Sequence, residues 1–202
     1  MRDFAVAYYQ NLKQVMDNLV VTDPKGNALE FSQGIGDAAA LIAKQARSGL
    51  KIFFIGNGAS AAISSHMATD FWKNGGMRAL SFNDGALLTC MGNDYGYEQV
   101  FAKPMQMFAD PGDVLIAISS SGQSANILLG VSAARHKQCL VITLSGFKPD
   151  NPLRSLGDYN FYVPAQTYGA VEIMHHSLCH CLLDMINHKK LIKLSEGEKA
   201  RI

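Results

Sequence analysis

Histidine and carboxylate side chains at helical spacing are the residues of this sequence best suited to chemistry. His66 is followed four residues later by Asp70, and Glu172, His176 and His180 repeat that interval near the end of the chain. Residues four apart on an α-helix lie only about 40° apart around its axis, and therefore on one face. Two such helices side by side would offer a set of imidazoles and carboxylates. Such a set suits a divalent metal such as zinc, or a pair of groups that transfers a proton.

A structural interpretation competes with this one, because a single histidine on a mixed helix usually only completes the packing. His175 and His176 are neighbours, and adjacent side chains on a helix point in different directions, so at most one of them can face a site. The same geometry disfavours a metal pair at Cys179-His180-Cys181. The functional interpretation therefore depends on what lies beside the two helices.

Two turns rich in small residues lie between apolar runs and the segments that follow them. The first turn is GNGAS, residues 56–60, just before the segment with His66, and the second is SSSGQS, residues 119–124. Glycine lets the backbone approach an anion closely, and free N–H groups at a helix start favour negative charge. Serine hydroxyls add further donors without adding charge. The two turns predict a phosphate-binding site.

A dinucleotide site and a nucleoside-triphosphate site fit these turns less well. Gly56-x-Gly58-x-x-Ala61 matches the dinucleotide fingerprint, with Asp84 after a possible second strand. A dinucleotide site leaves the serine-rich turn unused, and one serine would suffice as a helix cap. The Lys-Ser/Thr pair of nucleoside-triphosphate loops does not accompany either turn. We therefore expect a small phosphorylated ligand and no nucleotide cofactor.

The pattern of hydrophobic residues alternates between strand and helix. Buried strands are predicted at 52–55, 112–119 and 138–145, with weaker strands at 78–82 and 159–164. Helices are predicted at about 4–19, 29–47, 60–73, 98–108, 124–136 and 170–188, and Asn93-Asp94 is predicted to form a turn. Near-continuous apolar strands between helices predict a parallel sheet covered on both faces. Ligands of such sheets gather at the carboxyl ends of the strands, here after Ile55 and Ile118.

The length and composition fit one ordinary globular domain. Of the 202 residues, 48% are hydrophobic, and we divide the chain into N-terminal helices (1–48), an α/β core (50–188) and a charged tail (189–202). A net charge of +1 gives no electrostatic case for nucleic acid or a membrane surface as partner. The beginning of the chain does not read as a secretory signal, and the four cysteines lie mostly in apolar segments. We expect a cytoplasmic protein with free thiols.

Six segments, in order along nearly the whole chain, resemble the sugar isomerase (SIS) family and, within it, the phosphoheptose isomerases. They are GNGAS (56–60), SHMATDF (65–71), MGNDYGYEQVF (91–101), AISSSGQSANIL (117–128), VITLSG (141–146) and EIMHHSLCH (172–180). The resemblance implies an α/β three-layer sandwich, with a five-stranded parallel sheet flanked by helices and preceded by two N-terminal helices. It also implies a homotetramer with active sites near subunit contacts.

The resemblance further implies an activity and a set of site residues. Phosphoheptose isomerases convert sedoheptulose 7-phosphate to D-glycero-D-manno-heptose 7-phosphate, through an enediol, for heptose biosynthesis. Carried onto this chain, the phosphate site is Ser119, Ser120, Ser121 and Ser124. The residues that line the sugar are Asn57, Gly58, Ala59, Asn93 and Asp94, with Glu172 also in reach of substrate. The zinc ligands are His66, Asp70, Glu172 and His180, and the acid/base pair is Asp70 and His180.

Three positions depart from the family pattern. Asp70 stands where glutamate is more familiar, Glu172 where glutamine is usual, and Ala59 where a glycine is expected. A base that is one methylene shorter must still reach its proton. Asp70 acts either directly as the base, with His66 and Glu172 holding the ion, or, together with Glu172, as a carboxylate ligand in a tighter metal site. A non-catalytic SIS-type sensor that regulates a partner is the alternative function, but such relatives tend to lack these ionisable groups.

Overall fold

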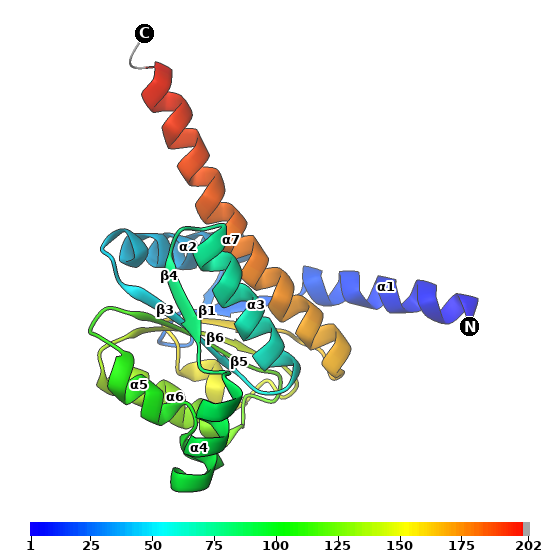
Figure 1. Ribbon diagram of the computed structural model, residues 1–202. Coiled ribbons are helices and arrows are strands. Elements are labelled where there is room, and N and C mark those ends of the chain that lie inside the picture. Colours follow the sequence, from blue (N-terminus) through cyan, green and yellow to red (C-terminus); the bar gives the residue numbers. More distant parts are fainter. Residues whose placement is uncertain (200–202) are drawn as a thin grey trace.

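The computed structural model describes residues 1–199, and the side chains of residues 1 and 3–188 (Figure 1). Its strands are β1 (Val20–Thr22), β2 (Ala28–Leu29), β3 (Lys51–Gly56), β4 (Arg78–Ser81), β5 (Val114–Ser119), β6 (Leu140–Ser145) and β7 (Tyr159–Tyr162). Its helices are α1 (Arg2–Asp17), α2 (Phe31–Arg47), α3 (Ala59–Lys73), α4 (Gly85–Tyr95), α5 (Ala102–Phe108), α6 (Ala125–His136) and α7 (Tyr168–Lys199), with 3-10 turns η1 (Tyr97–Gln99) and η2 (Pro152–Ser155). No helix within residues 1–199 has the length and hydropathy that a membrane span requires.

One sheet with the strand order β2-β1-β7-β6-β5-β3-β4 runs through the molecule. Its five strands from β7 to β4 are all parallel, which confirms the predicted five-stranded parallel sheet. The expectation was incomplete at one edge, where β1 and β2 add an antiparallel hairpin. The Asp23 carboxylate accepts the N–H groups of Lys25 and Asn27 in the hairpin turn, so the predicted break after α1 is a β-turn rather than an open loop.

The direction in which successive strands are added reverses between β3 and β5, and this reversal positions the ligand site. From β3 the chain continues to β4 on one side, whereas from β5 it continues to β6 on the other side. β3 lies between β4, which follows it in sequence, and β5. The loops after β3 and β5 therefore lead to helices on opposite faces of the sheet and separate at its carboxyl edge. In open α/β sheets, the crevice at such a reversal is where ligands bind.

Helices cover both faces of the sheet, as predicted (Figure 1). Alternate residues of one strand enter opposite cores. On one face, Ile52 and Phe54 pack with α2, α3 and α7. On the other face, Phe53 and Ile55 pack with α5 and α6. A third, smaller cluster joins α1 to the start of α7 through Leu12 and Val15, with Tyr8 packed against it.

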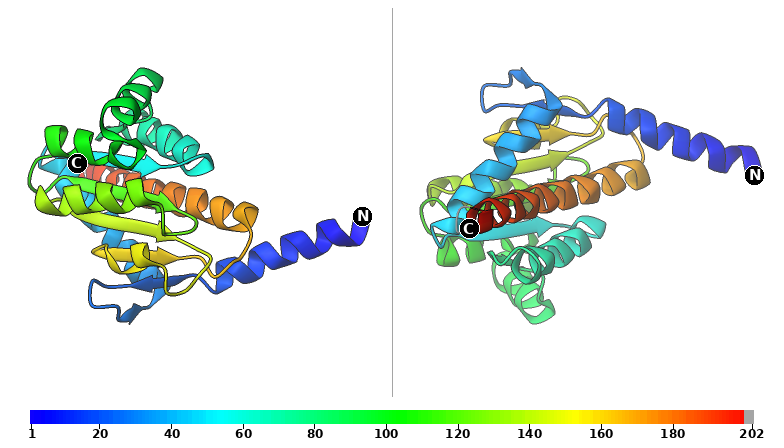
Figure 2. Two further views of the ribbon diagram at one scale, coloured as in Figure 1. Left: turned by 90° about the horizontal axis from the view of Figure 1, so that it is seen from below. Right: turned by 90° about the horizontal axis from the view of Figure 1, so that it is seen from above.

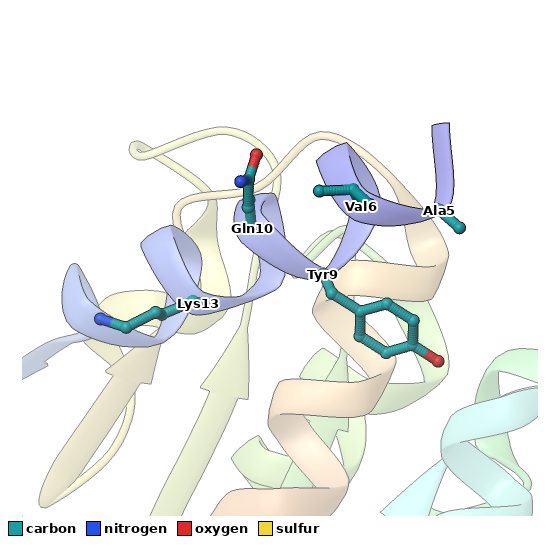
Figure 3. A pocket seen from close by; sticks show the side chains of 5 residues that line it. All are labelled: Ala5, Val6, Tyr9, Gln10 and Lys13. Atoms are coloured by element: carbon teal, nitrogen blue, oxygen red, sulfur yellow. The ribbon is translucent and has the colours of Figure 1, made fainter. Parts of the chain in front are cut away.

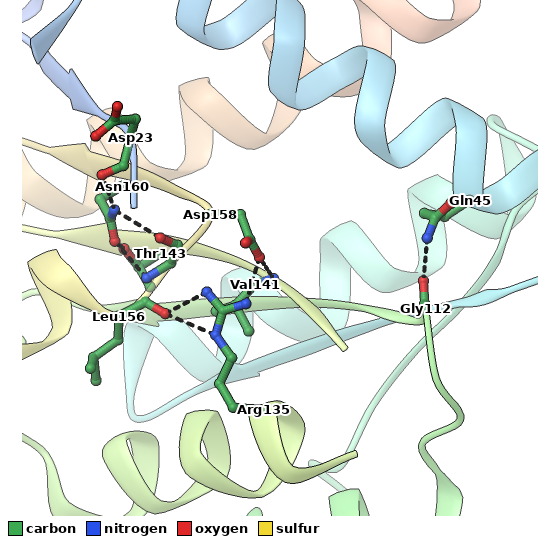
Figure 4. Close-up of polar contacts among 10 residues, drawn as sticks. Asp23, Gln45, Gly112, Arg135, Val141, Thr143, Leu156, Asp158 and Asn160 are labelled. Atoms are coloured by element: carbon green, nitrogen blue, oxygen red, sulfur yellow. Dashed lines mark hydrogen bonds and ion pairs between the residues drawn. The ribbon is translucent and has the colours of Figure 1, made fainter. Parts of the chain in front are cut away.

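Polar side chains connect β6, β7 and α6, away from the reversal between β3 and β5 (Figure 4). Arg135 donates to the Leu156 carbonyl and to Asp158, and Asp158 also accepts the N–H of Val141 at the start of β6. Buried Asn160 accepts the Thr143 hydroxyl across β6 and β7. These contacts pair polar groups that would otherwise be buried without partners.

The region between β4 and β5 differs from the prediction. Asn93 and Asp94 lie in α4 rather than in a turn, and the helix predicted at 98–108 is divided into η1 and α5. The Asp84 carboxylate caps α4 by accepting the N–H of Leu87. The chain turns instead at Gly96, whose φ of +87° suits glycine best. The predicted tail also begins inside α7, which extends to Lys199, and its residues 200–202 lie outside the described residues.

An ion-pair group holds the beginnings of β3 and β5 together. The fully buried Asp113 carboxylate accepts the N–H groups of Lys51 and Asp110. The Lys51 ammonium lies 2.9 Å from Asp113 and 2.6 Å from Asp110. The hydrogen bond and the charge of Lys51 hold the pKa of Asp110 below its ordinary value of 3.8.

The substitution Lys51→Met should raise the pKa of Asp110 toward 3.8, because its cation is removed. A carboxyl group whose pKa is lowered on folding stabilises the fold above its unfolded pKa, and that contribution is lost as the pH falls through the folded pKa. An NMR titration of the Asp110 carboxyl carbon in both proteins measures the shift, with exposed Asp17 as internal control. An unchanged Asp110 titration would contradict this assignment.

Candidate active site

The loops after β3 and β5 and the start of α7 enclose a pocket of about 250 Å³. We call it the serine pocket. Its lining is Asn57, Gly58, Ala59, Ser60, Ser119, Ser120, Ser121, Ser124, Tyr168 and Glu172. It lies at the sheet reversal, and it unites both turns in which the sequence predicted phosphate binding. Ser60 and Tyr168 were not predicted.

The serine-rich loop is held in shape by its own hydroxyls and by one glycine. Ser119 accepts the N–H of Gly122, and the Ser119 and Ser124 hydroxyls lie 3.5 Å apart. Gly122 has a φ of +63°, and a Cβ atom there would lie 1.9 Å from the Asn151 side chain. Ser124 is the N-cap of α6, but its side chain makes no capping hydrogen bond. Its hydroxyl therefore remains available to a ligand.

The other wall of the serine pocket depends on close backbone packing around α3. A Cβ atom on Gly56 would lie 2.5 Å from the Ser60 carbonyl, and Gly58 caps α3 with a φ of +55°. The first N–H groups of α3, which have no partner inside the helix, therefore begin at the pocket. Ala59 is the first residue of α3 and has no positive φ, so alanine is compatible with this position.

A pair of amides joins the two walls. Asn57 and Asn126 exchange hydrogen bonds of 2.9 and 2.8 Å, and the Tyr97 hydroxyl donates to the Asn57 oxygen at 3.3 Å. Asn126 is 3% exposed and lies in the first turn of α6. The contact fixes Asn57 against the serine-rich loop.

The serine pocket offers hydroxyl and N–H donors rather than cations. None of its ten described lining residues is lysine or arginine, and the one ionisable carboxyl is that of Glu172. A phosphate here would be held by neutral hydrogen bonds at a helix N-terminus. Asn93 and Asp94 do not belong to this lining: Asn93 donates to Asp94 and Cys90 donates to Asp94, all on exposed α4.

Beyond the serine pocket, α3 and α7 bring three histidines together. One ring nitrogen from each of His66, His176 and His180 lies within 4.8 Å of the others. The centroids of the His176 and His180 rings are 4.6 Å apart, and that of His66 is 5.2 and 5.6 Å from them. His176 was expected to share a helix face with His180 but was not predicted as a site residue. Its i, i+4 spacing between Glu172 and His180 was the available signal.

Asp70 lies beside this imidazole cluster, whereas Glu172 lies in the serine pocket. Asp70 Oδ2 is 3.4 Å from His66 Nε2, and Asp70 Oδ1 accepts the Asn74 amide at 3.2 Å. Glu172 precedes His176 by one turn of α7, about 6 Å along the axis. The structure thus brings His66, Asp70 and His180 together, while Glu172 joins the serines. The two groups are adjacent because α3 and α7 both begin at the pocket.

His175 points away from the cluster. It is fully buried, and its Nε2 lies 3.2 Å from the Ser145 carbonyl at the end of β6. Burial lowers the pKa of His175 to about 4, so its ring is neutral at pH 7. His175 is a packing residue, and His176 is the one of the pair that faces the site.

The donor set of the cluster fits a borderline divalent metal. The His176 Nε2 atom is buried and has no hydrogen-bond partner among the described residues. Burial lowers the pKa of His176, and the imidazoles of His180 and His66 lower it further, against the opposing effect of Asp70. A neutral ring keeps the lone pair that a zinc-type ion requires.

The substitution Gly122→Ala should distort the serine-rich loop. Alanine at a positive φ costs about 1 kcal/mol of stability, and here the added methyl group also collides with Asn151. We expect phosphate protection against thermal unfolding to be lost. Gly26→Ala is the matched control, because Gly26 has a φ of +81° but open space around it. Equal effects of the two substitutions on phosphate protection would contradict the role of the loop.

Comparisons with known proteins agree with this geometry. Residues 7–146 match the family model described as SIS domain. The phosphoheptose isomerase of Solidesulfovibrio magneticus is 37% identical over 165 residues, which cover 79% of this chain and 80% of that protein.

Solved structures give the same result over a larger part of the chain. The phosphoheptose isomerase of Neisseria gonorrhoeae superposes with a TM-score of 0.79 at 27% identity, covering 93% of this chain and 98% of that one. The phosphoheptose isomerase of Francisella tularensis gives 0.80 at 26% identity with the same coverage. The chain therefore belongs to the SIS domain family and, within it, to the phosphoheptose isomerases.

Proposed function

We propose that this protein converts sedoheptulose 7-phosphate to D-glycero-D-manno-heptose 7-phosphate through an enediol, as a step of heptose biosynthesis. One observation carries the proposal: a pocket of serine hydroxyls at the starts of α3 and α7 lies next to a cluster of imidazoles with a carboxylate farther along these two helices. A sugar phosphate has the matching arrangement, with an anion at one end and the reacting carbons at the other.

The serine pocket anchors the phosphate in this proposal. Ser119, Ser120, Ser121 and Ser124 donate to its oxygens, together with N–H groups at the start of α3. Asn57, held by Asn126, donates to or accepts from the sugar hydroxyls. A remote anchor of this kind supplies binding energy that holds the reacting carbons in place. Asn93 and Asp94 lie outside the serine pocket, and we assign them no contact with substrate.

The proton transfer is assigned to Asp70 and His180. Asp70 takes the proton from one of the two carbons C1 and C2 and returns it to the other, while His180 moves the proton between the two oxygens. Asn74 and His66 fix the orientation of the Asp70 carboxylate. Such orientation compensates for a side chain one methylene shorter than glutamate, because proton transfer needs hydrogen-bond reach.

His66 and His180 are the residues that would hold a divalent ion such as zinc; a His180 ring bound to the ion would no longer move the proton between the oxygens, and Asp70 would then carry the proton transfer alone. When bound, an ion of this type polarises the carbonyl of an open-chain sugar as a Lewis acid.

A sugar-phosphate sensor without activity is the second candidate. The serine pocket serves a sensor equally well, but the histidine cluster with Asp70 has no use in one. Turnover separates the two functions.

The substitution Asp70→Asn should lower kcat for sedoheptulose 7-phosphate by about 10²- to 10⁴-fold, because general acid–base catalysis contributes that much. Its KM should change little, since Asp70 is not in the phosphate anchor. A coupled assay of heptose 7-phosphate formation measures both constants. Asp184→Asn, an exposed carboxylate later on α7, is the control. Full activity of the Asp70 variant, or no activity of the wild type, would sink the proposal.

We also propose a homotetramer in which α1 makes a subunit contact. α1 projects from the body of the molecule (Figures 1 and 2). It leaves Phe4, Val6 and Tyr9 74%, 59% and 70% exposed, on more than one side of the helix. Val6 and Tyr9 border a shallow apolar hollow on this helix (Figure 3). Unpartnered apolar surface of this kind marks interaction sites. Because α1 packs on the start of α7, such a contact would lie near the serine pocket.

The double substitution Val6→Asp with Tyr9→Asp should reduce the four-chain mass expected of the wild type in size-exclusion chromatography with light scattering. Charged side chains on the apolar face of α1 would have to be buried without partners. Met107→Asp on α5, also at a highly exposed apolar residue, is the control and should keep the wild-type mass. A monomeric wild type, or dissociation only of the control, would refute this contact.

The cysteines favour the cytoplasm as the location. Cys90, Cys139, Cys179 and Cys181 are all free thiols, which persist in a reducing compartment.

A further inference from the structure

The imidazole cluster differs from the metal-ligand set that the family resemblance implies. That set contains Glu172 and omits His176. In the structure, the group of ligand atoms within 4.8 Å of one another is His66, His176 and His180, and it contains no carboxylate. Two members come from successive turns of α7, and the third comes from α3, which packs beside it.

The buried Nε2 atom of His176 requires an explanation. It has no hydrogen-bond partner among the described residues, and leaving a buried polar atom unpaired is unfavourable. Its ring lies at tilted or T-shaped angles to its two neighbours, so it does not stack on them. A ligand between the three rings would satisfy this nitrogen.

Glu172 is committed elsewhere. Its side chain lines the serine pocket with Tyr168 and the serine-rich loop, one helical turn before His176. Its carboxylate adds negative charge beside the serine hydroxyls rather than among the imidazoles.

We propose that His176, in place of the carboxylates of Asp70 and Glu172, completes with His66 and His180 a three-histidine site for a borderline divalent transition metal. This inference rests on the proposed function, because it concerns the ion of the same isomerase. Three histidines with one position left open form the donor pattern of catalytic zinc sites. Asp70, at 3.4 Å from His66, then lies beside a ligating imidazole without joining the ligand set, so its carboxylate stays available as the base. Glu172 is left free to contact substrate.

Metal affinity measured directly tests the assignment. The full chain, prepared without a histidine tag and stripped with a chelator, is titrated with Zn²⁺ against a chromophoric competitor. The variants are His176→Leu, His176→Gln and Glu172→Gln, with His66→Leu as a positive control and His136→Gln as a negative control. His136 lies on α6, outside the cluster. Thermal unfolding of each metal-free variant shows that it is folded.

We expect both His176 variants to raise the Kd for Zn²⁺ by more than about 100-fold, because even residues behind the ligands cost 10- to 100-fold. Glu172→Gln should change it by less than threefold. Co²⁺ in the wild type should give the strong visible bands of a four-coordinate site, and the His176 variants should lose them. A change below tenfold in a folded His176 variant, or a larger loss of affinity in Glu172→Gln, would overturn the proposal.

Failure of this inference and failure of the proposed function look different. Metal binding that depends on His176 in a protein without turnover would contradict the isomerase and leave the ligand set standing. Turnover together with metal binding that depends on Glu172 would support the isomerase and contradict the proposed ligand set.

Discussion

The position of β3 between β4 and β5 is the constraint on which the site depends. β4 follows β3 in sequence, yet β5 pairs with the opposite edge of β3. The loops that leave β3 and β5 must therefore part at the same edge of the sheet. Because one loop is rich in glycine and the other in serine, the gap between them becomes a lined pocket with a helix starting on each side.

α3 and α7 connect the serine pocket in that gap to the imidazole cluster. Both helices start at the serine pocket and run back over the same face of the sheet. Each turn of a helix advances by about 5.4 Å, so the serine pocket and the imidazole cluster are separated by a fixed rise along these helices. The packing of the helices on the sheet, rather than a loop, sets that distance.

Strong local patterns made most of the fold predictable. The continuous apolar runs that become β3, β5 and β6 are short and lie next to glycine- or serine-rich turns, which favours buried strands over helices. The β1–β2 hairpin was not predicted because its strands have only three and two residues, too few for an alternating hydrophobic pattern to be recognised. The turn predicted at Asn93-Asp94 was wrong because the chain turns at Gly96, two residues later, where glycine suits the left-handed backbone better.

The site was predictable only as far as local spacing determines it. The i, i+4 interval puts His66 beside Asp70 whatever the rest of the chain does. Which face of α7 meets α3 depends instead on how α7 is rotated, and that is set by the packing of Leu178, Leu182 and Ile186 against the sheet. These contacts turn His176 toward His66 and place Glu172 at the serine pocket. The i, i+4 spacing shows that His176 shares a helix face with His180, but not toward which neighbour that face turns.

The absence of lysine and arginine from the described lining of the serine pocket has a kinetic consequence. Long-range attraction of an anion requires net positive potential, and it weakens as salt screens the charges. Neutral donors act only at contact. The described lining therefore adds no long-range attraction for an anion, and its one carboxylate, Glu172, opposes the approach of one.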